Sequence, residues 1–154
     1  MTPAFPPLAT LLPHAPPMLL LDRVLEHGED WILVETTIAA DHPFFDPAAG
    51  GVPCHVGIEL MAQACGAFAG LGSLAEGRPP ALGFLLGTRM FTSSVARFMA
   101  GNHLTVRAAK LYLDGEMGAF DCRIDLDGTT VARAQLTVYQ PADATAVLAR
   151  RVEG

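Results

Sequence analysis

The sequence is short of basic residues. It contains ten lysines and arginines against 16 aspartates and glutamates, which gives a formal net charge of −6 at pH 7. Domains that bind nucleic acid use a basic patch to neutralise phosphates, so nucleic acid is not expected as the main partner. A negative total still permits a local basic patch, and an acidic protein partner therefore remains open.

The sequence also has few cysteines, and its start lacks a targeting signal. Cys54, Cys65 and Cys122 have neither the spacing of a metal site nor that of a disulfide framework, and the five histidines lack zinc-ligand spacing. We therefore expect no metal and no cofactor. Residues 1–17 are rich in proline and lack a basic segment followed by an apolar one, unlike a signal peptide. These features predict a cytoplasmic protein.

Long hydrophobic runs are absent, although the composition is apolar. We find no run of the about 20 apolar residues that a bilayer-spanning helix needs, so no membrane is expected. Yet 51% of the residues are hydrophobic, only 17% are charged, and the mean hydropathy is +0.33. This composition predicts an additional apolar surface, either a subunit interface or an acyl-binding site. At 154 residues we expect one domain, over 1–142, followed by a C-terminal tail, 143–154.

Periodicity and turn signals predict one sheet and one long helix. A loop is expected over 41–53, which holds three prolines and two glycines, and Gly-Arg-Pro-Pro at 77–80 ends the helix. The Asp127-Gly128 pair is a strong hairpin signal. We expect a short helical turn over 8–12 and strands over 18–25, 31–40, 82–91, 104–113, 120–126 and 131–139. The order β-β-α-β-β-β-β predicts an α+β protein whose antiparallel sheet surrounds a central helix.

The helix carries the most informative pattern. The run Val56–Leu71 contains only two strongly polar side chains, Glu59 and Gln63, and His55 stands just before it. At about 100° per residue, these three would share one narrow stripe of a helix. The remainder is apolar all round, which is typical of a buried helix. A carboxylate there is costly unless it is paired or used, so Glu59 is a candidate catalytic acid.

Three neighbours are candidates to assist Glu59. His55 lies one turn before it and is a candidate general base, the role that histidine most often fills. His42, in the preceding loop, is a second candidate base. Gln63 is expected to hold the carboxylate of Glu59, or a water molecule, in position.

Several stretches of the chain resemble one protein family. Over residues 11–138 they are similar to the hot-dog-fold 3-hydroxyacyl-acyl-carrier-protein dehydratases of fatty-acid synthesis. The helix motif is most similar to dehydratase-like proteins of aryl-polyene pigment pathways. The matching stretches are Leu11-Leu12-Pro13-His14, Pro17–Val24, Pro43-Phe44-Phe45, Gly57–Ala64, Arg97–Val106 and Gly128–Val138.

The resemblance implies a fold, a reaction and an assembly. It implies a hot-dog fold that acts as a homodimer or as a hetero-oligomer with another hot-dog subunit. The implied substrate is a 3-hydroxyacyl thioester of acyl carrier protein or coenzyme A, which loses water to give the trans-2-enoyl thioester. His55, or else His42, would take the Cα proton, and Glu59 would protonate the leaving hydroxyl. In the family, base and acid come from opposite subunits.

The resemblance also suggests binding residues. Free N–H groups from Cys54 through Val56 to Gly57, in the first turn of the helix, would hold the thioester oxygen as an oxyanion hole does. The Cys54 side chain is expected to act as a small apolar residue rather than as a nucleophile. Three basic residues are candidates for the phosphate of phosphopantetheine or for an acidic carrier protein, the alternative being ordinary solvated charge: Arg89, Arg97 and Lys110.

One departure from the family leaves two other functions open. The family's loop carries a Gly-His-Phe-Pro-Gly motif whose histidine is the base, whereas Asp46–Pro53 is shorter and has no histidine. Cys54 stands where the family has glycine. The chain could therefore be a hot-dog thioesterase, in which Glu59 activates water. It could equally be a degenerate dehydratase subunit that acts with an active partner.

Overall fold

The computed structural model describes residues 5–12, 18–77 and 84–139; His14, residues 78–80 and the expected tail 143–154 lie outside these ranges. Within these ranges, two short 3-10 turns, η1 and η2, accompany one α-helix and eight strands. The elements are η1 (Leu8–Thr10), β1 (Arg23–His27), β2 (Trp31–Thr37), β3 (Gly51–Pro53), η2 (Cys54–Val56), α1 (Gly57–Ala75), β4 (Phe84–Ser93), β5 (Arg97–Met99), β6 (His103–Asp114), β7 (Met117–Leu126) and β8 (Thr129–Tyr139).

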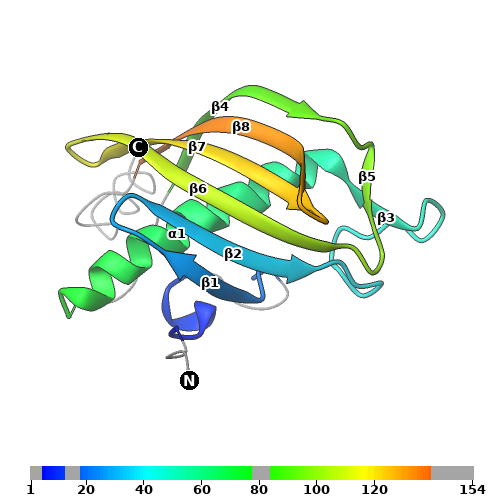
Figure 1. Cartoon of the computed structure of the whole chain (residues 1–154), viewed down its shortest axis with the longest axis horizontal. Coiled ribbons are helices and arrows are strands. Elements are labelled where there is room, and N and C mark those ends of the chain that lie inside the picture. The colour runs from blue at the N-terminus through cyan, green and yellow to red at the C-terminus, as the bar shows by residue number, and fades with distance from the viewer. Residues whose placement is uncertain (1–4, 13–17, 78–83, 140–154) are drawn as a thin grey trace, which may run out of the picture.

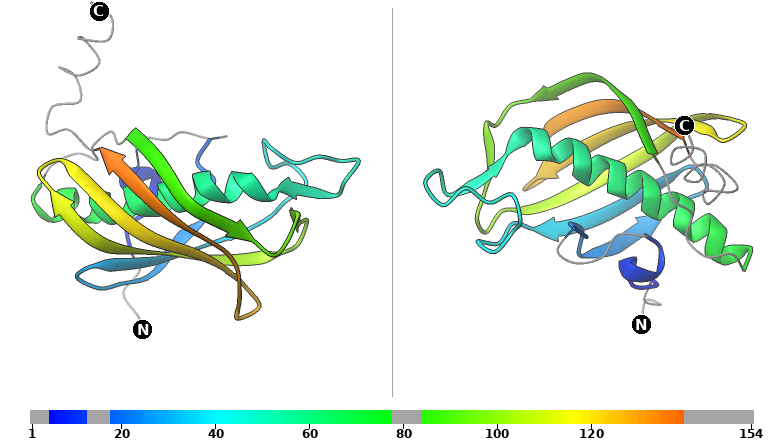
Figure 2. Two further views of the ribbon diagram at one scale, coloured as in Figure 1. Left: turned by 90° about the horizontal axis from the view of Figure 1, so that it is seen from above. Right: turned by 180° about the vertical axis from the view of Figure 1, so that it is seen from behind.

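The six long strands form one antiparallel sheet in the order β1-β2-β6-β7-β8-β4. The sheet curves around α1, which lies along its concave face (Figures 1 and 2). The predicted α+β architecture, an antiparallel sheet around one central helix, is confirmed. Strands β3 and β5 form a separate two-stranded sheet next to the start of the helix.

The closing strands follow the predicted pattern. Along β7, Phe120, Cys122 and Ile124 are buried on the inner face of the sheet. Asp127 and Gly128 both have positive φ, 52° and 80°, as a tight hairpin turn requires. The hairpin expected from this pair therefore joins β7 to β8 as predicted.

The helix is covered on two sides, which explains why it is apolar all round. On the sheet side, the Cα of Gly57 lies so close to Ile124 and Phe98 that a Cβ atom there would come within 2.9 Å of Ile124. On the other side runs the N-terminal segment (residues 5–12 and 18–22), in which Leu11 and Leu12 are buried. This segment covers part of the helix face that the sheet does not reach, at Gly66 and Gly70.

The helical stretch is longer than expected from the apolar run. Cys54–Ala75 spans 22 residues with a mean hydropathy of 1.3, long and apolar enough by length and composition to cross a bilayer. The expectation that nothing in the chain reaches this length is therefore wrong. The core helix of a soluble protein meets the same description, and this helix packs between the sheet and the N-terminal segment.

Two local expectations fail for identifiable reasons. The strand expected over 18–25 begins only at Arg23, because the backbone of Met18 and Leu20 bonds to the side chain of Gln63 instead of to a strand. The loop expected over 41–53 ends in the short strand β3, whose Val52 pairs with Phe98 of β5. Only three residues pair in each strand, so neither gives a periodic signal.

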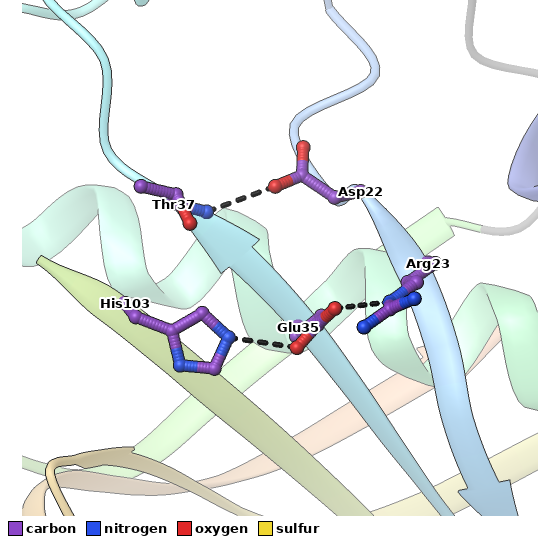
Figure 3. A network of polar contacts seen from close by, with 5 residues as sticks. All are labelled: Asp22, Arg23, Glu35, Thr37 and His103. Atoms are coloured by element: carbon purple, nitrogen blue, oxygen red, sulfur yellow. Dashed lines mark hydrogen bonds and ion pairs between the residues drawn. The ribbon is translucent and has the colours of Figure 1, made fainter. Parts of the chain in front are cut away.

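A polar network ties three strands together on the outer face of the sheet (Figure 3). Glu35 of β2 accepts hydrogen bonds from Arg23 of β1 and, at 2.7 Å, from His103 of β6. Asp22 accepts the backbone N–H of Thr37 at 2.9 Å. Burial alone would raise the pKa of Glu35, but the hydrogen bonds from His103 and Arg23 outweigh it and hold that pKa below its usual value.

We predict that this network makes stability depend on pH. A lowered folded-state pKa means that Glu35 stabilises the fold above the pKa it has in the unfolded chain. That contribution is lost as the pH falls through the folded-state value. Glu35→Gln should remove it, reducing the free energy of unfolding at pH 7 by less than about 1 kcal/mol, as for other partly exposed ion pairs. Urea unfolding of both proteins between pH 7 and 3 checks this, since the difference should vanish at the acidic end.

Candidate active site

Glu59 and Gln63 form the centre of the candidate site. Both project from α1 towards the N-terminal segment, one turn apart, and Gln63 Nε2 donates to Glu59 Oε1 at 3.1 Å. Gln63 is buried, with 1% of its surface exposed, whereas Glu59 is half-buried. The predicted pairing of these two side chains is confirmed, and the carboxylate is less enclosed than the sequence suggested.

Gln63 also fixes the N-terminal segment. Its Oε1 accepts the Leu20 N–H at 2.9 Å and its Nε2 donates to the Met18 carbonyl at 2.8 Å. These bonds set the orientation of the amide, so that only its NH₂ group faces Glu59. The backbone at Met18–Leu20 is therefore a wall of the site, a role that the sequence analysis missed. Gly66 and Gly70 in the helix, discussed below, were the available signal.

We predict that Gln63→Leu damages both stability and activity. Leucine fills a similar volume but leaves the buried Leu20 N–H and the part-buried Met18 carbonyl without their partner, and an unsatisfied buried group costs about 1–3 kcal/mol. Urea unfolding should show a loss of about 3 kcal/mol. Gln63→Glu is the matched variant, because it retains an acceptor for Leu20 but cannot donate to Glu59 when ionised. It should lower the rate at neutral pH; an unchanged rate would contradict the positioning role.

His55 does not lie where helical periodicity placed it. It belongs to η2, whose geometry advances by about 120° per residue rather than 100°. Its side chain is exposed, and within the described part of the chain it makes no hydrogen bond to Glu59. Of the expected stripe of His55, Glu59 and Gln63, the side-chain hydrogen bond within the described ranges therefore joins Glu59 and Gln63 and does not include His55.

His42 is held in a tautomer that does not suit a base. Its Nδ1 accepts the backbone N–H of Phe44 at 3.1 Å, so the proton of the neutral ring sits on Nε2. That Nε2 is buried and has no hydrogen-bond partner in the described ranges. Burial lowers the pKa of His42, against the opposing effect of Asp41. The ring is thus neutral and presents an N–H rather than a lone pair.

The start of the helix offers fewer free amides than expected. The Cys54 N–H donates to the Ala96 carbonyl at 3.0 Å, and the Gly57 N–H bonds to the carbonyls of Cys54 and His55. The expectation that these two amides are free is wrong, because the bend before β5 accepts the N–H of Cys54 and η2 accepts that of Gly57. Val56 is buried, and its side chain contributes to the core.

The three basic candidates for carrier binding do not converge. Lys110 pairs with Asp30 at 3.1 Å and lies 5.8 Å over the Phe68 ring, so its contacts are internal. Arg89 is exposed in β4, at the edge of the large sheet, whereas Arg97 is exposed in β5 opposite Pro53. Of the three, only Arg97 lies beside the start of the helix.

No metal site accompanies this arrangement within the described ranges, where no three His, Cys, Asp or Glu side chains are grouped to hold an ion. The three cysteines are free thiols, and Cys65 and Cys122 lie 3.8 Å apart, Sγ to Sγ, in the core. The Glu59 carboxylate held by Gln63, with the His55 imidazole at the same start of the helix, suits proton transfer.

Comparison with known proteins decides the family. The family model described as ApeP-like, ApeP dehydratase, matches residues 6–149. The chain belongs to the ApeP-like dehydratases. It is a dehydratase and therefore a lyase, and the resemblance to the dehydratases of fatty-acid and aryl-polyene synthesis is confirmed.

Two proteins of known family are similar to this ApeP-like dehydratase over most of its length. It is 30% identical, over 127 residues, to the 3-hydroxyacyl-[acyl-carrier-protein] dehydratase FabZ of Streptococcus pyogenes serotype M3, a match covering 82% of this chain and 90% of FabZ. It is also similar to a chain in the ApeI:P dehydratase heterocomplex of Xenorhabdus doucetiae. That match has a TM-score of 0.88 and 30% identity and covers 94% and 96% of the two chains.

More distant structures share only the fold. A hypothetical thioesterase protein of Streptococcus pneumoniae TIGR4, solved with coenzyme A, has a TM-score of 0.60 and 16% identity, covering 77% of this chain and 86% of that one. At this identity the likeness supports the hot-dog architecture and not thioester hydrolysis. Membership of the family therefore establishes that this ApeP-like dehydratase catalyses dehydration. Its substrate and the roles of its residues are matters for proposal.

Proposed function

We propose that this ApeP-like dehydratase removes water from a 3-hydroxyacyl thioester carried by acyl carrier protein and releases the trans-2-enoyl thioester. The observation that carries the proposal is the half-buried Glu59 carboxylate held by Gln63 at the start of the central helix. Its FabZ relative is named for the same reaction.

In the proposed mechanism, two side chains exchange protons with the substrate. His55 removes a proton from Cα, and the electron pair forms the Cα–Cβ double bond as the C–O bond at Cβ breaks. Glu59, protonated, gives its proton to the departing hydroxyl, which leaves as water. His42 is the weaker candidate for the base, because its Nδ1 lone pair accepts the Phe44 N–H.

We propose that a second hot-dog subunit completes the site. Among the strands that the structure describes, β4 pairs only with β8, so it forms an edge of the sheet. It carries exposed apolar side chains at Leu85, Leu86 and Met90, which are 41%, 54% and 71% exposed. An uncovered apolar edge favours a partner strand. The relative from Xenorhabdus doucetiae works in a heterocomplex, which supports a second, different subunit; a homodimer is the alternative. We place the assembly in the cytoplasm, where free thiols persist.

The test follows the reverse reaction. A trans-2-enoyl thioester is mixed with the purified protein, alone and with its co-purified hot-dog partner, and enoyl absorbance is followed with a thiol reagent present. Absorbance loss without thiol release, absent in His55→Ala and Glu59→Gln, supports the proposal. Thiol release that requires Glu59 would instead indicate a thioesterase.

A subunit that is active only together with a partner would give a different result in the same assay. The loop histidine of the family is missing from 46–53, and this favours a subunit that supplies only part of the site. Activity that appears only with the second subunit, and survives His55→Ala while needing Glu59, would show that the base comes from the partner. Full activity of the isolated chain would exclude this function.

If the chain is active as a homodimer, mixing variants locates the two residues. His55→Ala and Glu59→Gln are each inactive in this scheme. If base and acid come from opposite subunits, a mixed dimer regains one complete site, and random pairing restores about a quarter of the activity. If both come from one chain, mixing restores none.

A further inference from the structure

Three arginines stand in one row across the sheet. Arg107 of β6 is directly opposite Arg123 of β7, and Arg123 is directly opposite Arg133 of β8. The strands are neighbours (Figure 1), so the three side chains share a face at cross-strand spacing. Like charges placed directly opposite destabilise a sheet. A chain with only ten lysines and arginines has nonetheless gathered three of them in this arginine row.

Two members of the arginine row are compensated within the chain. The guanidinium of Arg107 lies 5.5 Å over the Trp31 ring. Arg123 Nε lies 3.4 Å from Asp125, although that nitrogen has no hydrogen-bond acceptor in the described ranges. Arg133, at the end of the row, is exposed and makes no ion pair or hydrogen bond with any residue that the structure describes. Its charge is therefore available to a ligand.

Arg133 opens onto a cavity lined by hydroxyl groups. The cavity is open to solvent and measures about 510 Å³. Its lining residues are Thr92, Ser93, Ser94, Thr130, Val131, Ala132 and Arg133.

Not every hydroxyl in the cavity is free to bind a ligand. Ser93 donates to the Val95 carbonyl and Thr130 donates to Asp125, each at 2.7 Å. Thr92 lies directly opposite Arg133, and Ser94 makes only a long bond of 3.4 Å. A guanidinium with two hydroxyl donors beside it suits a phosphate group.

The cavity is joined to the candidate active site by a short backbone link. The Ser94 N–H donates to the Val131 carbonyl at 2.8 Å, and two residues later the Ala96 carbonyl accepts the Cys54 N–H at 3.0 Å. The cavity and the start of the helix therefore lie at the same end of the molecule, where β4 ends and β8 begins (Figure 1). Arg133 lies on the outer face of the sheet and the helix on its concave face, so a ligand with a phosphate at one end and a thioester at the other would pass around the end of the sheet to reach both.

We propose that Arg133, with Thr92 and Ser94, binds the phosphate of the pantetheine arm that carries the acyl group. This inference rests on the proposed thioester substrate. Acyl carrier protein and coenzyme A both present this phosphate next to pantetheine. Arg133 thus selects phosphorylated carriers over bare pantetheine thioesters, and the remainder of the arginine row adds positive potential behind it.

The test compares three carriers of the same enoyl group: acyl carrier protein, coenzyme A and unphosphorylated pantetheine. Arg133→Ala should raise KM by about tenfold for the first two, the value of one charge-assisted hydrogen bond, with little change in kcat. For pantetheine, KM should not move. Arg133→Lys should recover part of the loss. A change with acyl carrier protein alone, or with coenzyme A alone, would identify which of them is the source of the phosphate.

Arg23→Ala is the matched control, because it removes one positive charge from the same face at the far edge of the sheet. An equal KM rise for pantetheine, or the same effect from Arg23→Ala, would overturn the proposal. Binding of desulfo-coenzyme A, measured by calorimetry, does not need turnover. Arg133→Ala should weaken it about tenfold, and equal binding by the two proteins, together with an unchanged KM for acyl carrier protein, would overturn the phosphate site. Turnover of the pantetheine substrate separately tests the proposed reaction.

Discussion

Glu59→Gln is expected to abolish dehydration and leave the fold intact. Glutamine has nearly the same shape and its side-chain oxygen can still accept the hydrogen bond from Gln63. It cannot, however, deliver a proton to the leaving hydroxyl. Loss of a general acid typically costs about 10²–10⁴-fold in rate, and we expect kcat to fall within that range. The measurement is hydration of the enoyl thioester by the active assembly, with urea unfolding of each variant alongside.

The control for this variant is Glu26→Gln. Glu26 is exposed on β1 and the change removes the same charge without touching the helix. Its kcat should equal that of the wild type. If Glu59→Gln retained more than a tenth of the activity, the Glu59 carboxyl group would not be the general acid, and another group would have to protonate the leaving hydroxyl.

The pairing at the centre of the site could be predicted because it obeys a local rule. Glu59 and Gln63 are four residues apart within one regular α-helix, where that spacing places side chains in contact. The same rule failed for His55 because the chain enters the helix through a 3-10 turn. Nothing in the apolar pattern marks where a 3-10 turn gives way to an α-helix, so the direction of a side chain at that junction requires the structure.

Features built from distant segments were not predictable. The residues 18–22 have the composition of a strand, but their backbone bonds to a glutamine side chain more than 40 residues away. The arginine row depends on the exact register of three strands, and a shift of one residue would place Arg123 on the other face. Arg89, Arg97 and Lys110 are the carrier-binding candidates in the sequence, because spacing along the chain does not reveal that Arg107, Arg123 and Arg133 align across three strands.

Two glycines of the helix are the sequence feature that indicates that the N-terminal segment packs against it. Glycine is unfavourable inside a helix by about 1 kcal/mol relative to alanine, so glycine at Gly66 and Gly70 requires a reason. A Cβ atom at Gly66 would lie 2.8 Å from the side chain of Leu12, and one at Gly70 would lie 2.1 Å from the backbone oxygen of Leu11. The helix lacks side chains at these points because another segment passes directly against it.

A pair of glycine variants tests this packing with opposite expected signs. Gly70→Ala places its methyl group against the Leu11 backbone, which cannot yield as a flexible side chain can. We expect a net loss of about 2 kcal/mol in the free energy of unfolding, because overpacking outweighs the gain in helix propensity. Gly72→Ala, two residues further, meets nothing within 4 Å and should gain about 1 kcal/mol.

The effect should extend from packing to catalysis. Displacing Leu11 from the helix loosens the segment whose Met18 and Leu20 bond to Gln63, the side chain that positions Glu59. Gly70→Ala should therefore also lower kcat, whereas Gly72→Ala should leave it unchanged while raising the melting temperature. If both variants were equally stabilising, the N-terminal segment would not pack on the helix as described. If Gly70→Ala lost stability but kept full activity, the segment would cover the helix without holding the carboxylate in place.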